Sequence, residues 1–321
     1  MFFVSGPEDC QAHAYTYDGA RTDRRLIFPS CVEVCSEGPR VAPDGSVPDL
    51  TDKPSDLSSG TWAPDSRKIC GLLQGPVRPI RVGWYALNAP QNVHVTTYPG
   101  LFRWDRSGRY ALATCDPRAG IATLVADNTT GSVDALAVID LTRPTVLWQK
   151  RFSEPPAGPI SVVAAPDARY LAVQYTRQPP TPAWSPAPIH CTSGRPCGIP
   201  LPPKTPPPVP TRADLYALRP TPHIIGRLTG QRVVGWSGDG SRVVVWNSHG
   251  PSGIGDTVSV VSARDGHLIW QTAGSYGASI SAPGLSTLVI QTPQPKEEAT
   301  IDLIDPTGRA RRLDMHGSLI R

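Results

Sequence analysis

The chain has 321 residues, of which 39% are hydrophobic and only 18% charged, so it can bury a substantial core but lacks the charge typical of long solvent-facing helices. The net charge of +4, without a Lys/Arg run, leaves no electrostatic footprint for nucleic acid, and we predict no such partner. No apolar run approaches the roughly 18 residues of a membrane span, so we predict no transmembrane segment in this chain.

The first residues, Met1–Gly6, lack the basic region and the apolar core of a signal peptide. Two explanations stay open. The protein is cytoplasmic, or the chain begins downstream of an export signal or membrane anchor.

A first hairpin is predicted near the N-terminus, with strands at Ala14–Tyr17 and Arg24–Phe28 around an Asp18-Gly19 turn. The segment 29–60 that follows is predicted to be a loop insertion. It contains Cys31 and Cys35, whose spacing can close a short disulfide loop.

Five later segments share one pattern: an apolar strand, a tight polar turn and a second apolar strand. They are Thr61–Leu73, Arg103–Thr114, Val163–Val173, Gly235–Trp246 and the degenerate Ile280–Ile290. Pro-Asp and Asp-Gly turn residues supply the backbone angles that a hairpin needs. Equivalent positions recur at intervals of 42, 60, 72 and 45 residues. The short intervals match one four-stranded propeller blade, and the long ones match a blade with an insertion.

A second hairpin follows each of the five, so each unit reads strand A, turn, strand B, loop, strand C, turn, strand D. The predicted C and D strands are Ile80–Leu87 with Val93–Tyr98, Ala135–Asp140 with Val146–Phe152, Asp214–Leu218 with His223–Leu228, Thr257–Ser262 with His267–Thr272, and Thr300–Ile304 with Ala310–Met315. No stretch of helical period competes with this pattern.

These units predict an all-β fold, a β-propeller with six four-stranded blades, as a single domain over residues 1–321. Gly317–Arg321 and Phe2–Ser5 have the lengths of the A and B strands that the N-terminal hairpin lacks. Strands from both termini can therefore complete the first blade and remove exposed sheet edges. A truncated seven-bladed ring is the alternative.

The Trp-x-Pro-Asp-Ser-Arg motif at Trp62–Arg67 and the Trp-Ser-Gly-Asp-Gly-Ser-Arg motif at Trp236–Arg242 resemble the PD40-type repeats of TolB-like and WD40-like propellers. The resemblance covers roughly Thr61 to Met315. It implies a bacterial, often envelope-associated, protein-binding propeller, although this fold carries many unrelated activities.

All long insertions are predicted on one face of the propeller, because they fall in B–C and D–A connections. They are 29–60, 116–133, the Pro-rich 177–211 and 248–256. A rigid scaffold with its irregular loops on one face is typical of a binding surface, and tolerated decoration is the alternative explanation. The binding residues that we predict on this loop-rich face are Arg118, Trp184, His190, Arg195 and His249.

The cysteines give information on the cellular compartment of the protein. Cys191 and Cys197 can close a second short disulfide loop, whereas Cys70 and Cys115 end strand-like runs and are expected to be small buried hydrophobes. The loop cysteines favour an extracytoplasmic location over a cytoplasmic one. A zinc site needs a second Cys/His pair that this sequence does not offer beside His190, so we predict no metal.

The other conspicuous residues are expected to have structural roles and not catalytic ones. Trp62, Trp104 and Trp236 recur at one position of the repeat and are expected in the core between blades. No local hydrolase, nucleotide-binding or metalloprotease motif is present, and no cofactor is implied.

We therefore predict a non-catalytic scaffold that binds a protein or peptide partner through its loop-rich face. One alternative is a propeller lyase or hydrolase whose site is assembled at the mouth of the central channel. The other is the extracytoplasmic sensor domain of a membrane-anchored protein.

Overall fold

The computed structural model describes residues 2–5, 11–27, 57–73, 79–103, 109–127, 132–152, 160–179, 208–248, 255–294, 297–313 and 318–320. These residues form β-strands, turns and short connections, and no helix occurs among them. In this part of the chain there is accordingly no helical segment with the length and apolarity of a membrane span.

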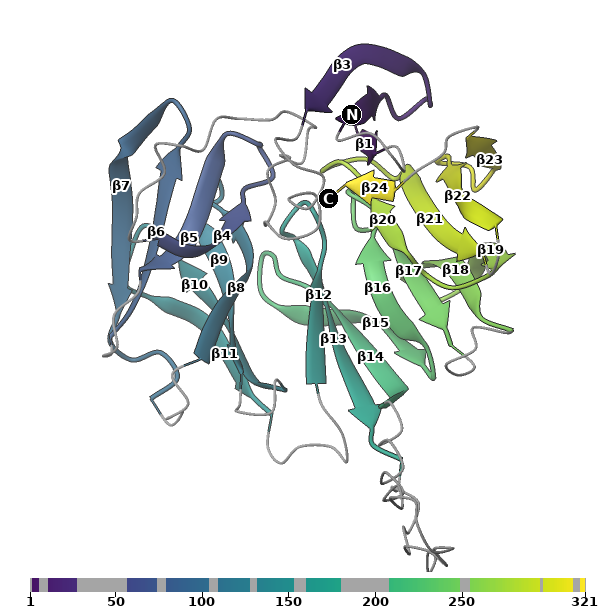
Figure 1. The fold of residues 1–321 in the computed structure, drawn as a ribbon. Helices are drawn as coiled ribbons and strands as arrows, with labels where there is room; N and C mark the ends of the chain where they lie inside the picture. Colours follow the sequence, from purple (N-terminus) through teal and green to yellow (C-terminus); the bar gives the residue numbers. More distant parts are fainter. Residues whose placement is uncertain are drawn as a thin grey trace, which may run out of the picture.

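The strands form six antiparallel sheets of four strands each, which are the six blades of a β-propeller (Figure 1). Blade 1 contains β24 (Ser318–Ile320), β1 (Phe2–Ser5), β2 (Gln11–Tyr15) and β3 (Arg21–Ile27). Blade 2 contains β4 (Leu57–Trp62), β5 (Lys68–Leu73), β6 (Ile80–Ala86) and β7 (Ala89–Tyr98). Blade 3 contains β8 (Arg109–Asp116), β9 (Ile121–Asp127), β10 (Val133–Asp140) and β11 (Val146–Arg151).

Blade 4 contains β12 (Ile160–Ala164), β13 (Tyr170–Arg177), β14 (Val209–Ala217) and β15 (His223–Thr229). Blade 5 contains β16 (Arg232–Trp236), β17 (Arg242–Asn247), β18 (Thr257–Ser262) and β19 (Leu268–Ala273). Blade 6 contains β20 (Ala278–Ile280), β21 (Leu288–Gln294), β22 (Glu297–Ile304) and β23 (Ala310–Leu313).

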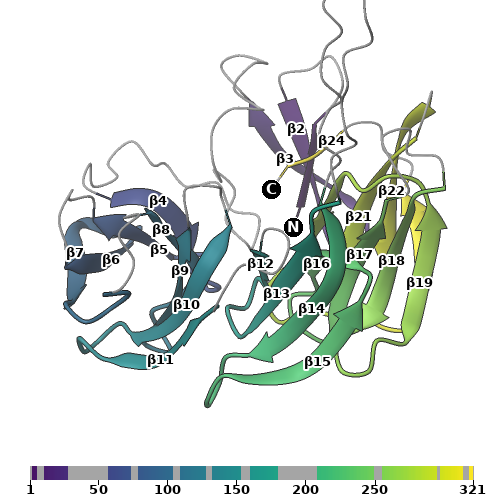
Figure 2. The same cartoon turned by 90° about the horizontal axis from the view of Figure 1, so that it is seen from below.

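The first strand of each blade packs on the first strand of the next. Contacts run from β4 to β8, β12, β16, β20 and β24 in turn, so these strands occupy the inner side of the blades. Figure 2 shows the same succession of blades from below.

The hydrophobic core lies between adjacent blades, in five clusters that join blades 2 to 3, 3 to 4, 4 to 5, 5 to 6, and 6 to 1. The strand period explains this arrangement, because successive side chains point to opposite faces of a sheet. On β17, Val243 and Val245 pack toward blade 4, while Val244 between them packs toward blade 6. A run of valines is therefore what a strand covered on both faces requires.

The expected completion of the first blade by both termini is confirmed. β24 pairs antiparallel with β1, with Phe3 opposite Ile320, and Figure 1 shows the two ends of the chain beside these strands. β1 in turn pairs with β2. The two chain ends are therefore held in one sheet, and six blades are the observed count.

The hairpin that the repeat predicts at Arg103–Thr114 is wrong. Leu101 and Phe102 belong to the connection between β7 and β8, where both are buried and Phe102 stacks on Tyr110 at 5.8 Å between ring centroids. Arg109–Asp116 is the inner strand of blade 3, and its hairpin partner is Ile121–Asp127. The predicted insertion 116–133 thus contains a strand, because Asp116–Gly120 forms the tight turn.

Cys70 and Cys115 are a second correction. They are buried as expected, but they form a disulfide with Cα atoms 6.4 Å apart. Cys70 lies on β5 of blade 2 and Cys115 on β8 of blade 3, so the bond links adjacent blades. Cys31, Cys35, Cys191 and Cys197 lie outside the described residues, as does Trp104.

The two faces of the propeller differ in their connections. The A–B and C–D turns lie at one end of the blades, which we call the tight-turn face, and the B–C and D–A connections lie at the other, the loop-rich face. Between β13 and β14 the chain leaves one blade strand at Arg177 and returns at Val209, opposite it in register. Most of this Pro-rich insertion, and most of 29–60 and 248–256, lies outside the described residues.

Candidate binding pocket between two blades

The structure places only one of the five predicted binding residues. Arg118 lies in the turn between β8 and β9, and therefore on the tight-turn face and not on the loop-rich face. Its guanidinium pairs with Asp65 of blade 2, with Nε 3.0 Å from Oδ2. Trp184, His190, Arg195 and His249 lie outside the described residues, and their roles stay predictions.

Short aspartate-capped turns build the tight-turn face. Asp65, Asp167 and Asp239 each accept a hydrogen bond through Oδ1 from the backbone N–H two residues later, at 2.9 to 3.0 Å. Asp116 does the same in blade 3, where the N–H groups of Arg118 and Ala119 donate to its Oδ1. Such side-chain-to-backbone bonds fix the turn, so the residues that follow each aspartate project from a rigid base.

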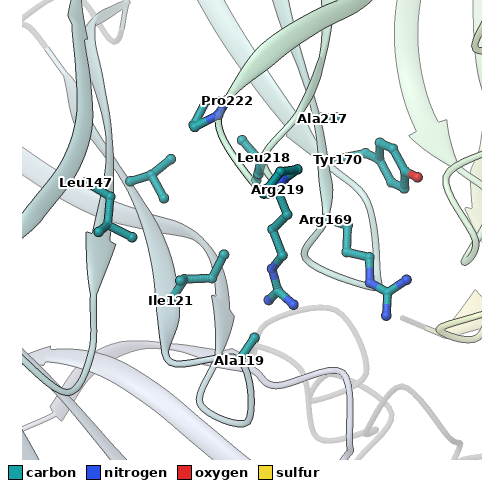
Figure 3. A pocket seen from close by; sticks show the side chains of 11 residues that line it. Ala119, Ile121, Leu147, Arg169, Tyr170, Ala217, Leu218, Arg219 and Pro222 are labelled. Carbon is teal, nitrogen blue, oxygen red and sulfur yellow. The ribbon is translucent and has the colours of Figure 1, made fainter.

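A pocket of about 590 Å³ opens between blades 3 and 4 on this face (Figure 3). Its size is within the range of sites that hold small molecules or short peptide segments. Blade 3 contributes the β8–β9 turn and parts of β9, β10 and β11, and blade 4 contributes its two tight turns. The lining residues are Ala119, Ile121, Val138, Leu147, Arg169, Tyr170, Ala217, Leu218, Arg219, Pro220 and Pro222.

The walls are held by the core beneath them. Val138 and Leu218 belong to the buried cluster between blades 3 and 4. Tyr170 stacks on Trp236 of blade 5 at 6.0 Å, and the Trp236 indole N–H donates to the carbonyl of Val163. Trp236 is therefore part of the core between blades, as its place in the repeat predicts.

Arg219 joins the two blades that form the pocket. Its Nη2 donates to Asp116 Oδ2 at 2.8 Å, which fixes the guanidinium against the β8–β9 turn. The other oxygen of Asp116 caps its own turn. Arg219 is thus oriented by a carboxylate that is itself held in place.

Arg169 is exposed, and it makes no ion pair with a carboxylate among the described residues. Asp167, two residues earlier, is buried, and burial raises the pKa of its carboxyl above the usual value. Hydrogen bonding from the Arg169 backbone N–H and the charges of Arg169 and Arg219 oppose this rise without overcoming it. The side chains of Arg169 and Arg219 extend in the same direction in Figure 3.

This arrangement can bind a ligand. None of the eleven lining residues is a serine, cysteine, histidine, aspartate or glutamate, and Tyr170 is the one lining residue of a type that can act as general acid, general base or nucleophile. No group of metal-ligating side chains occurs in the described part of the chain.

The sequence did not reveal this pocket, because its residues come from three separate turns and five strands of two blades. The only local signal is a pair of arginines at turn motifs, with Arg169 after Pro-Asp-Ala and Arg219 before Pro220. That signal becomes meaningful only when the packing of blade 3 on blade 4 is known.

No protein-family profile and no curated protein matches the chain. Among solved structures, it is similar to TolB from Acinetobacter baumannii, with 14% identity, a TM-score of 0.42, and coverage of 99% of this chain and 64% of TolB. Oligopeptidase B from Leishmania major shows 12% identity and a TM-score of 0.45, with coverage of 81% of this chain and 34% of the peptidase. The propeller domain of the Trilobed protease from Pyrococcus furiosus shows 8% identity and a TM-score of 0.45, with coverage of 80% and 70% respectively.

The chain thus spans less than two thirds of TolB and about a third of the oligopeptidase. Likeness at these identities concerns the fold, and nothing about activity is taken from it. The six blades, their inner-strand packing and the joined termini are properties of this chain itself. In its fold, the chain is a six-bladed β-propeller.

Proposed function

We propose that this protein is a non-catalytic binding propeller that holds a peptide segment of a protein partner in the pocket between blades 3 and 4. The observation that carries this proposal is a cavity with apolar walls and two guanidinium groups, beside two turns that Asp116 and Asp167 fix. Apolar area supplies affinity in such a site, and a few positioned polar groups supply orientation.

The size of the cavity supports a peptide as the ligand. A volume of about 590 Å³ accommodates a few side chains, and Leu147 at its edge is half exposed. An exposed leucine beside a cavity is apolar surface that a partner can cover. A lyase or hydrolase would instead need two or more acid, base or nucleophilic groups converging on the ligand, and the lining of this pocket offers only Tyr170.

The disulfide between Cys70 and Cys115 supports the proposal of an extracytoplasmic location. Disulfides persist in oxidising compartments and are rare in the cytosol. The loop-rich face stays part of the proposal as a second contact surface, because the long insertions leave the blades there.

Selection from a random peptide library tests the function. The immobilised protein is challenged with the library, and the affinity of each selected peptide is measured by fluorescence anisotropy for wild type and for Leu147→Glu. Placing a carboxylate in the apolar wall is expected to weaken binding at least tenfold, because it replaces apolar surface that the peptide covers and must lose its water when the peptide binds.

Leu268→Glu is the matched control. Leu268 also stands at the start of an outer blade strand and is 58% exposed, against 50% for Leu147, but it does not line the pocket. Peptides whose affinity falls equally in both variants, or in neither, would place the binding surface elsewhere. Failure to select any peptide would remove the proposed function.

A further inference from the structure

We infer that the pocket recognises a carboxylate that stands next to an apolar side chain, with Arg169 as the group that binds the carboxylate. This inference rests on the proposed peptide-binding function and names the chemistry of the ligand.

The charged residues that line the pocket are all positive. Its only ionised lining residues are Arg169 and Arg219, and no carboxylate lines it. An apolar ligand would cover a guanidinium without compensating its charge, which costs free energy, whereas an anionic group would compensate it. Charge complementarity therefore favours an anion.

The two arginines have different roles. Arg219 is already paired with Asp116, with Nη2 2.8 Å from Oδ2, so its guanidinium forms a fixed part of the pocket wall. The Arg169 guanidinium pairs with no described carboxylate. Asp167 Oδ1 instead accepts a hydrogen bond from the Arg169 backbone N–H at 2.9 Å. Arg169 is consequently the donor that remains for a ligand.

The apolar part of the ligand has a place beside these groups. Ile121 and Leu147 lie on the blade 3 side of the pocket, across from Arg169 on blade 4, with Arg219 between them in Figure 3. A ligand whose carboxylate meets Arg169 can direct a neighbouring side chain toward Ile121 and Leu147. A guanidinium accepts a carboxylate through two parallel hydrogen bonds, which adds orientation to the charge attraction.

A carboxylate in a peptide comes from the C-terminus or from a glutamate or aspartate side chain. Both sources share the chemistry that Arg169 recognises, and synthetic probes separate them. The first probe is an acetylated Gly-Ser-Gly-Ser-Leu peptide with a free C-terminus, and the second is its C-terminal amide. The third is an amidated acetyl-Gly-Ser-Gly-Glu-Leu peptide, which offers only a side-chain carboxylate.

Binding is measured by two-dimensional NMR titration at low salt for wild type, Arg169→Gln, Arg169→Lys and Arg264→Gln. We expect an acidic probe to bind about tenfold more tightly than the neutral amide, a preference that Arg169→Gln abolishes and Arg169→Lys partly keeps. Arg264→Gln removes an exposed turn arginine of blade 5 outside the pocket and is expected to change nothing. Preference for the first probe assigns the C-terminus, and preference for the third assigns a side chain.

Equal binding of acidic and neutral probes, or an acid preference that survives Arg169→Gln, overturns the inference. It is also overturned if no acidic probe binds while library peptides still bind in a manner sensitive to Leu147→Glu, and that result leaves the proposed function standing. If the library peptides do not bind either, the proposed peptide-binding function is contradicted together with the inference.

Discussion

At the scale of single residues, close backbone approaches between blades carry large consequences. A β-carbon on Gly238 would lie 1.6 Å from the carbonyl oxygen of Ala282 in the next blade. Gly238 also donates its backbone N–H to Ser281 Oγ at 2.8 Å. The absence of a side chain at this position is what lets blades 5 and 6 meet on the tight-turn face.

Gly238→Ala is therefore expected to lower the free energy of unfolding by about 3 kcal/mol or more, because backbone would have to move. Gly230→Ala is the control: Gly230 has a φ of +70° but nothing within 4 Å of an added β-carbon. It should cost only about 1 kcal/mol of backbone strain. Urea denaturation compares the two, and equal losses would show that the contact with Ala282 is unimportant.

The turn aspartates make stability depend on pH. Hydroxyl groups of Thr142, Ser262 and Thr307 donate to Asp140, Asp265 and Asp305, and these bonds are the largest cause of the lowered pKa of each carboxyl. The pKa of Asp265 falls to about 2.

A carboxyl whose pKa is lower in the folded state binds fewer protons there, so it stabilises the fold above its unfolded pKa of 3.8. That contribution is lost as pH falls through the folded value. Burial gives Asp167 the opposite sign, because its pKa is raised.

Asp305→Asn isolates the charge effect at one turn. We expect this variant to be less stable than wild type at pH 7 and the difference to shrink as the pH falls below 3.8 and through the lowered pKa of the folded Asp305 carboxyl, because both side chains are uncharged below it. Urea denaturation across this range measures it. A difference that is constant with pH would mean that the charge of Asp305 contributes nothing to the turn.

At the scale of elements, the disulfide is a covalent link between blades 2 and 3. Cys70 and Cys115 are 45 residues apart, and a bond that closes such a loop commonly contributes about 2–4 kcal/mol. Replacing both by alanine should lower the free energy of unfolding by that amount. Peptide mapping under non-reducing conditions provides the direct check, and alkylation of both thiols without a reductant would contradict the bond.

The Pro-rich insertion is predicted to be dispensable for folding. Arg177 on β13 lies opposite Val209 on β14, so residues 178–208 can be replaced by an Asn-Gly turn that suits a hairpin. The shortened chain should unfold in one cooperative transition near the wild-type midpoint. Loss of the β-sheet circular dichroism signal would mean that the insertion is part of the core.

The repeat motif predicted most of the blades but not the third one. Asp-Arg-Ser-Gly at 105–108 and Asp-Pro-Arg-Ala-Gly at 116–120 are both good turn sequences, and local propensity does not choose between them. The choice is made by packing, because Leu101 and Phe102 are buried in the core with Tyr98 and do not form a blade strand. The second turn then pairs β8 with Ile121–Asp127.

The disulfide and the pocket escaped prediction for a related reason. Cys70 and Cys115 stand on strands of different blades, so their spacing carries no signature. Arg169 and Arg219 belong to different turns of blade 4, and their pocket exists only because blade 3 packs beside them. Local patterns give the blades, whereas contacts between blades give the site.

At the scale of the whole molecule, the two ends of the chain share one sheet, and blades 3 to 6 are covered by a neighbouring blade on both faces. In the described part of the chain, stability is thus distributed over five interfaces between blades. Such a scaffold can keep a pocket preformed, which lowers the entropy cost of binding.

Hydrogen-exchange mass spectrometry, with and without a selected peptide, tests the binding-propeller account most directly. We predict slower exchange on binding in the turns at 116–121 and 217–222 and around Arg169, the segments that surround the pocket. Protection confined to the connections 178–208 and 248–256, with no change in those turns, would place the partner on the loop-rich face and contradict the account.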